Sequence, residues 1–166
     1  MADPLKVLRT VIVTETGLAD DRVLLYNTKW NLPQDDGMFI VLSIVGSQVI
    51  ATGKQHVHDA QGLLEVQETI LSDEIAVDVF SKAYEARDRR HEVIWALNSD
   101  TMQRACEVDA LKVSDFPTDF RDLSFLEANA RINRYHLTFR VSHLERREKL
   151  VEYYSTYSGY DLRIEP

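Results

Sequence analysis

Side chains alternate between apolar and polar over the run from Ala130 to Leu144, ARINRYHLTFRVSHL. Because successive side chains of a β-strand point to opposite faces of its sheet, this period of two predicts one long strand. Its dry face holds Tyr135, Leu137, Phe139 and Val141, and its wet, cationic face holds Arg134, His136, Thr138 and Arg140. Such a strand belongs in a sheet that is covered on one side.

The first part of the chain predicts a helix and then a short strand. Pro4 suits a first helical turn, apolar residues follow it at helical spacing, and Gly17 offers a stop. These signals predict an amphipathic helix over residues 4–16. Residues 23–26 favour a short strand within an otherwise loop-like segment.

Four further strands are predicted in the middle of the chain. Residues 38–45 form an apolar run that indicates a strand buried on both faces. Glycine at positions 46 and 53 indicates a hairpin in which residues 48–52 pair back. Beyond it the pattern predicts a polar segment at 54–62, a strand at 63–71 and a clearer strand at 74–80.

Two helices are predicted before the final strand. Ser81 is a suitable N-cap for the first, which carries an apolar stripe to Leu97. Arg90 interrupts that stripe, so its side chain either snorkels to water or meets a carboxylate across an interface. Asp100 and Gln103 resemble a capping box that opens a second helix ending at Leu111. Residues 115–122 follow as a loop.

The order of these elements predicts an α+β fold, with a mainly antiparallel β-sheet and helices packed on one face in a single domain. A chain of 166 residues suits one such domain. We expect it to occupy residues 1–149. Residues 150–166 carry Tyr153, Tyr154, Tyr157 and Tyr160. They form either a C-terminal extension that docks on a neighbour or a strand that closes the domain's own sheet.

The sequence offers weak candidates for chemistry. His56 and His58 share one side of an extended segment, but zinc needs three or four converging ligands. His91 lies between carboxylates and arginines that form ion pairs on a wet helix face more readily than a catalytic site. Cys106, the only cysteine, reads as a small buried hydrophobe. Nucleotide-binding and nucleophile motifs are absent, so we expect neither enzymatic activity nor a metal or cofactor.

The net charge and the lengths of the apolar segments bear on three further classes: nucleic-acid-binding, secreted and membrane proteins. The formal net charge of −8 argues against tight binding to a nucleic-acid backbone. The acidity is concentrated in residues 1–85, which hold 13 Asp and Glu against 6 Lys and Arg. The N-terminus does not read as a signal peptide, and no apolar run is long enough to cross a bilayer. We therefore expect a protein that is neither secreted nor bound to a membrane.

Three segments, in order, resemble the tail terminator proteins of tailed phages, a neck family related to tail completion proteins. The first is NLPQDDGMFIVLSIVG at 31–46, which follows the N-terminal helix. The second, DEIAVDVFSKAYEARDRRHEVIWAL at 73–97, is a strand that feeds directly into a helix. The third, LEANARINRYHLTFRV at 126–141, opens the final strand. With the helix, the resemblance covers residues 4–144.

The resemblance implies an α+β protein of the virion that assembles in the host cytoplasm as a homohexameric ring. Such a ring caps the tail tube, ends its growth and faces the head-side connector or stopper protein, with the tail sheath as a further neighbour. Genomic DNA would pass through the lumen without specific binding. The candidate subunit or partner interface then comprises Arg90, Arg134, His136, Arg140, Tyr153, Tyr154, Tyr157 and Tyr160.

Two alternatives remain open at this point. Within the same class, the chain is another neck, stopper or baseplate adaptor protein. From a different class, it is a small cytosolic α+β binding domain or a hydrolase that uses His56, His58 or His91.

Overall fold

A computed structural model describes residues 3–26, 28, 33, 35–59, 62–127 and 130–151 of this protein. The helices are α1 (Pro4–Thr16), the 3-10 turn η1 (Asp20–Arg22), α2 (Glu85–Arg89), α3 (His91–Leu97) and α4 (Asp100–Asp109). The strands are β1 (Val23–Leu25), β2 (Phe39–Asp59), β3 (Gly62–Ser81), β4 (Leu111–Ser114), β5 (Arg121–Asp122), β6 (Phe125–Glu127) and β7 (Ala130–Leu150).

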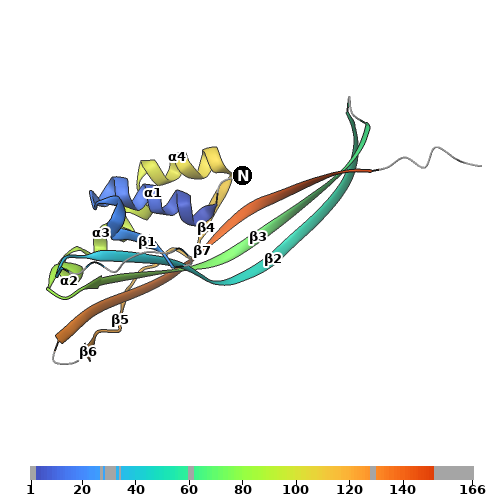
Figure 1. The fold of residues 1–166 in the computed structure, drawn as a ribbon. Coiled ribbons are helices and arrows are strands. Elements are labelled where there is room, and N and C mark those ends of the chain that lie inside the picture. Colours follow the sequence, from blue (N-terminus) through green and yellow to red (C-terminus); the bar gives the residue numbers. More distant parts are fainter. Residues whose placement is uncertain are drawn as a thin grey trace, which may run out of the picture.

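The long strands β2, β3 and β7 form the centre of one sheet, in the order β1-β2-β3-β7-β4. The strands β5 and β6 also pair with β7. All described pairs are antiparallel except β1 with β2. The helices lie together on one side of the sheet, so the α+β fold predicted from the sequence is confirmed (Figure 1). The sheet side away from the helices is called the outer face below.

The helix α1 has the bounds that its sequence predicts. The side chain of Asp3 accepts a hydrogen bond from the backbone nitrogen of Leu5 at 3.0 Å, and Pro4 occupies the first turn. Gly17 ends the helix in the left-handed conformation, with φ 65°, where a side chain would be strained. Both ends are therefore fixed by local chemistry.

The core fills the space between the helices and the inner face of the sheet. Tyr135, Leu137, Phe139 and Val141 are all buried there, as the alternation along β7 predicts. The register places Val77 opposite Leu42 on one side and opposite Leu137 on the other. Apolar side chains from α1, α3 and α4 complete the cluster, including Leu5, Leu8, Ile12, Val93, Leu97 and Met102.

The hairpin predicted at residues 46–53 is wrong. The strand β2 runs through both glycines and continues to Asp59, so the segment 54–62, predicted as a polar loop, is mostly strand. The register with β3 shifts between Ile44 and Gly46 and again between Val49 and Ala51, which shows irregular pairing where a turn is predicted. Burial on both faces of β2 extends only to Leu42, because Ile44 and Val45 are exposed.

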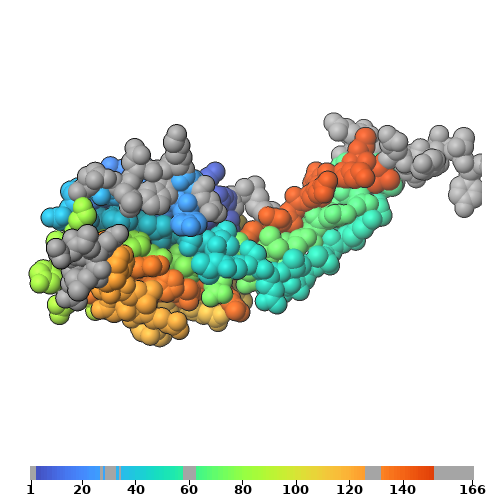
Figure 2. Space-filling view, turned by 60° about the horizontal axis from the view of Figure 1, so that its bottom comes forward, coloured from blue at the N-terminus to red at the C-terminus, as the bar shows by residue number. Residues whose placement is uncertain are grey.

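The two strands predicted at 63–71 and 74–80 are one continuous strand, β3. Together β2, β3 and β7 extend past the helices as a three-stranded projection (Figures 1 and 2). We call this projection the arm and define it as residues 49–59, 62–71 and 144–150. It starts where β4 stops pairing with β7, at His143.

The helical segment after β3 also departs from prediction. Ser81 is the last residue of β3, and its hydroxyl accepts from the backbone nitrogen of Ala86 at 3.0 Å. The predicted single helix is divided into α2 and α3 at Arg90. The N-cap of α4 is Ser99, one residue before Asp100, and its hydroxyl accepts from the backbone nitrogen of Met102 at 3.1 Å. The helix α4 ends at Asp109, and Leu111 begins β4.

Candidate interaction surface

The predicted cationic side chains of β7 meet an acidic partner on the outer face. Arg134 donates through Nε to Asp78 Oδ1 at 2.9 Å, and Nδ1 of His136 lies 3.0 Å from the same oxygen. Asp78 is on β3, opposite His136, and is buried. The alternation of residues 74–80 already places Asp78 on this face, but the sequence alone does not show that it is the common partner. The outer face is therefore charge-compensated at this position and less cationic than expected.

Arg140 and Arg90 do not join this pair. Arg140 Nε lies 3.7 Å from the Asp115 carboxylate, and both side chains are exposed, so the contact is weak. Arg90 lies on the helix side of the sheet, with its guanidinium carbon 4.8 Å from the centroid of the Tyr135 ring. That contact covers the ring of Tyr135 with the Arg90 side chain. Of the predicted interface residues, Tyr153, Tyr154, Tyr157 and Tyr160 lie outside the described residues.

An apolar groove of about 520 Å³ lies beside Asp78 on the outer face. The rings of Phe39 and Phe80 stack at 5.0 Å between centroids, and the guanidinium carbon of Arg134 lies 5.4 Å from the centroid of Phe80. The residues that line it are Tyr26, Pro33, Phe39, Val41, Asp78, Phe80, Ser81, Lys82, Phe125, Ile132 and Arg134. We call it the groove. Its aromatic members come from strands far apart in sequence, which is why the sequence analysis did not find it.

The arm exposes large apolar side chains. Val49, Ile50, Val57, Ile70 and Leu150 are between 40% and 57% exposed. Figure 2 shows the three strands of the arm running side by side away from the body of the molecule. One polar contact on it joins Lys54 to Glu65 at 2.8 Å, and this hydrogen bond lowers the pKa of the Glu65 carboxyl.

The two edges of the arm differ in chemistry. Within the described residues, β2 and β7 each pair only with β3 along the arm, so each leaves one edge open. The β7 edge carries five consecutive charged residues at 145–149, whereas the β2 edge at 49–53 carries none. An open strand edge presents backbone groups that can pair with another chain.

A buried polar cluster lies at the base of the arm. Asp73 accepts from the hydroxyl of Ser47 at 2.6 Å and lies 2.9 Å from Nε2 of His143, and both Asp73 and His143 are 6% exposed as side chains. Although the cluster contains serine, histidine and aspartate, the serine contacts the carboxylate and not the imidazole. The hydroxyl therefore has no imidazole beside it, as a serine nucleophile of a triad would, and the cluster joins three strands where the apolar core ends.

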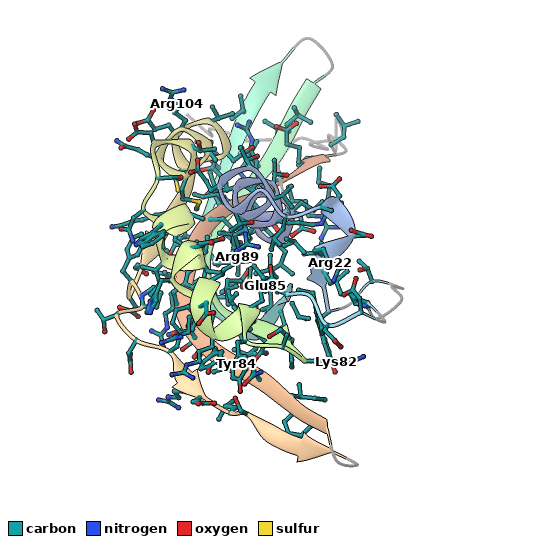
Figure 3. The ribbon with its side chains drawn as sticks, turned by 90° about the vertical axis from the view of Figure 1, so that its left-hand side faces the viewer. Arg22, Lys82, Tyr84, Glu85, Arg89 and Arg104 are labelled. Carbon is teal, nitrogen blue, oxygen red and sulfur yellow. The ribbon has the colours of Figure 1, made fainter. Side chains whose placement is uncertain are left out.

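A second polar network closes the opposite end of the body, where Figure 3 shows Glu85, Arg89 and Arg22. Glu85 accepts from the backbone nitrogen of Met38 at 2.8 Å and from Arg89 at 2.7 Å. Hydrogen bonds from Arg89 and then Met38 lower the pKa of the Glu85 carboxyl. Nearby, the hydrogen bond from Arg22 lowers the pKa of Asp35 to about 2. These contacts hold the segment that leads into β2.

The weak chemical candidates do not come together. His56 is on the arm, 3.8 Å from Glu65, and the ring of His91 packs edge-on against Phe120 at 5.9 Å. Among the described side chains, which do not include that of His58, no three His, Cys, Asp or Glu residues could share a metal ion. Cys106 is partly buried against the core, and this burial raises the pKa of its thiol.

Comparison with known proteins adds no family: no family model matches this sequence, and no curated protein is significantly similar to it. In the part of the chain that the structure describes, no helix is both long enough and apolar enough to cross a membrane. A proposal of function therefore starts from the arm, the outer face and the groove.

Proposed function

We propose that this protein is a structural component of a phage virion, a tail terminator that assembles as a homo-oligomeric ring at the head-proximal end of the tail. The ring ends the growth of the tail tube and joins the tail to the neck. The observation that carries the proposal is the arm, a preformed projection with exposed Val49, Ile50, Val57, Ile70 and Leu150. The resemblance of residues 4–144 to tail terminators agrees with it.

The physical argument starts from the cost of exposed apolar surface. Burying one Val or Ile side chain in an interface contributes about 1.5–3 kcal/mol. Because the strands of the arm are already hydrogen-bonded to one another, docking it needs little further ordering of the backbone. A projection that contacts a different surface on the next copy makes a head-to-tail interface, and such interfaces close into rings when the rotation permits.

The proposed partners follow from this arrangement. The ring, taken as a hexamer, would contact the tail tube protein on one side and the head-side connector or stopper on the other, with the tail sheath as a further neighbour. The net charge of −8 suits a lumen through which DNA slides, since few phosphate contacts would form. Another neck or baseplate adaptor protein would use the same arm, and tail-tube capping distinguishes it from a terminator.

Light scattering after size exclusion, with negative-stain images in the presence of tail tubes, tests the proposal. We expect the wild-type chain to form rings or to cap the tubes. The double variant Val49→Lys/Ile50→Lys should remain monomeric, because it places two charges on the apolar edge of the arm. The matched control is Val108→Lys on α4, where Val108 is 83% exposed, and it should assemble like the wild type.

Two outcomes would contradict the proposal. One is a wild-type chain that stays monomeric and ignores tail tubes. The other is an arm variant that assembles as well as the Val108→Lys control, since the arm would then take no part in assembly.

A further inference from the structure

We infer that the tyrosine-rich segment 152–166 of one copy docks in the groove of a neighbouring copy. This inference deepens the proposed function, on which it rests, because it names the contact that joins neighbouring copies. It depends on three observations: the chemistry of the groove, the composition of the segment, and the distance between the groove and the end of β7.

The groove is suited to aromatic side chains. The stacked rings of Phe39 and Phe80 form part of its wall, together with Phe125 and Ile132. Phe125 is 44% exposed, which is unfavourable for a large ring unless another surface covers it. At about 520 Å³ the groove lies within the range of about 300–1,000 Å³ that is typical of binding sites.

The segment supplies a matching set of groups. Its sequence, EYYSTYSGYDLRIEP, carries four tyrosines, three acidic residues and one arginine. A tyrosine ring packs on apolar walls while its hydroxyl reaches a polar group, and Asp78, Ser81 and Arg134 are among the polar groups of this groove. Although Asp78 pairs with Arg134, the two cations Lys82 and Arg134 outnumber this one carboxylate in the groove, which suits a segment of net negative charge.

The distance along the chain excludes the segment of the same copy as the occupant of the groove. Arg134, in the groove, and Val151, the last described residue, are 17 residues apart along β7 and its end. At a rise of about 3.2 Å per residue this separation is roughly 54 Å. Tyr160, the last of the four tyrosines, is nine residues beyond Val151 and reaches at most about 32 Å from it. None of the four tyrosines can therefore return to its own groove.

The arm thus carries the segment away from its own body and presents it to a neighbour. One copy contributes a segment and the next contributes a groove, so the two contacting surfaces are different. Repeating this contact gives the head-to-tail arrangement that a ring requires.

The direct test uses the full chain with the photo-cross-linking residue p-benzoylphenylalanine in place of Tyr157. Equal amounts of nitrogen-14- and nitrogen-15-labelled protein are mixed and irradiated, and mass spectrometry identifies the linked peptides. We expect cross-links between differently labelled copies, from position 157 to peptides that contain Phe39, Phe80 or Phe125. The same cross-linker in place of Trp95, which is 69% exposed on α3, is the positional control and should not label the groove.

A matched pair of variants tests the groove itself. Phe125→Lys should reduce the cross-link about tenfold or more, whereas Phe116→Lys should leave it unchanged. Phe116 is 43% exposed and lies outside the groove, so both substitutions place a charge at an equally exposed phenylalanine. Cross-links confined to one copy, directed to another surface, or insensitive to Phe125→Lys would overturn the inference.

A complementation experiment provides a second measurement in full-length protein. A variant with serine at all four tyrosine positions lacks the docking groups, and Phe125→Lys lacks the groove, so each alone should be monomeric by light scattering. Mixed together they should form dimers, because one supplies an intact groove and the other an intact segment. A mixture that stays monomeric, or a serine variant that assembles normally, counts against the docking.

The two proposals fail separately. Rings without groove cross-links would leave the tail terminator proposal standing and overturn the docking of segment 152–166. Groove cross-links between copies that neither form rings nor cap tubes would overturn the tail terminator proposal and leave the docking of segment 152–166 standing.

Discussion

The side chain of Asp78 determines the charge balance of the outer face around Arg134 and His136. Its carboxylate is buried and contacts both Arg134 and His136, so it compensates charge that the sequence leaves unpaired. Removing a partner from a buried ionic contact costs more than the contact contributes, because the remaining charge stays desolvated. Asp78 is therefore expected to matter more for stability than its exposed neighbours.

We predict that Asp78→Asn lowers the free energy of unfolding by about 1–2 kcal/mol, because Arg134 loses its ionised partner. For a chain of this size, that change lowers Tm by about 2–8 °C. Thermal unfolding followed by circular dichroism measures it. Asp115→Asn, which removes the exposed partner of Arg140, is the control and should change Tm little; equal effects would refute the assignment.

Glu85 gives a prediction about pH. Because hydrogen bonds from Arg89 and Met38 lower its folded-state pKa, its stabilising contribution is present above the ordinary value of 4.5 and is lost as the pH falls through the folded-state pKa. Glu85→Gln should therefore lower Tm at pH 7 and lose its difference from the wild type at acidic pH. Tm measured from pH 7 to pH 3 tests this. Glu107→Gln, on the exposed side of α4, is the control, and parallel curves for wild type and Glu85→Gln would contradict the prediction.

At the scale of elements, local signals predict some parts of the fold and not others. The bounds of α1 follow from Asp3, Pro4 and Gly17, which act within one turn of the chain. The buried face of β7 follows from its alternation, because one side packs on helices. In the arm only Val66 is buried among the described side chains, so its strands lack a regular period of two, and Gly53 resembles a turn signal.

The groove could not be predicted for a related reason. Phe39 and Phe80 each lie in a segment that the sequence predicts as a strand, but their contact depends on the register between β2 and β3. Register over more than forty residues is set by the whole sheet and not by neighbouring residues. The same holds for the contact of Asp78 with Arg134, whereas the placement of Arg134 and His136 on one face follows from β7 alone.

The base of the arm gives the prediction at this scale. Asp73→Ala leaves Ser47 and the buried His143 without their common partner, and should cost about 2–3 kcal/mol. We expect backbone amides of the arm to exchange with solvent roughly tenfold faster or more, while those of α1 stay protected. Hydrogen exchange with mass spectrometry measures both. Ser72→Ala, at the adjacent position, is the control, and uniform acceleration across the whole chain would contradict a role confined to the arm base.

At the scale of the whole molecule, the body and the arm differ in how they bury apolar side chains. The body encloses an apolar core between helices and sheet, and the arm extends the same three central strands beyond that core. The expected boundary between residues 149 and 150 falls at the last residue of β7, and the backbone of Val151 still bonds to Leu63 at 2.9 Å. Folding and assembly should therefore be separable by truncation after this point.

We predict that a chain ending at Val151 keeps its Tm within a few degrees, because the core of helices and sheet is complete without residues 152–166. The same truncation should weaken assembly about tenfold or more if the segment docks on a neighbour. Thermal unfolding and sedimentation velocity measure the two effects. Loss of folding would instead assign the tyrosines to the domain's own sheet, as a closing strand.

The two edges of the arm differ in how readily each can pair with a further strand. Five consecutive charged residues on the β7 edge disfavour the addition of a second strand, because pairing would desolvate them, whereas the β2 edge at 49–53 carries no charge. Strand-by-strand stacking into amyloid-like fibres needs two adhesive edges on every molecule, and this arm offers one. A chain with one adhesive edge can pair through the arm with a second copy, but it cannot extend strand by strand into a fibre.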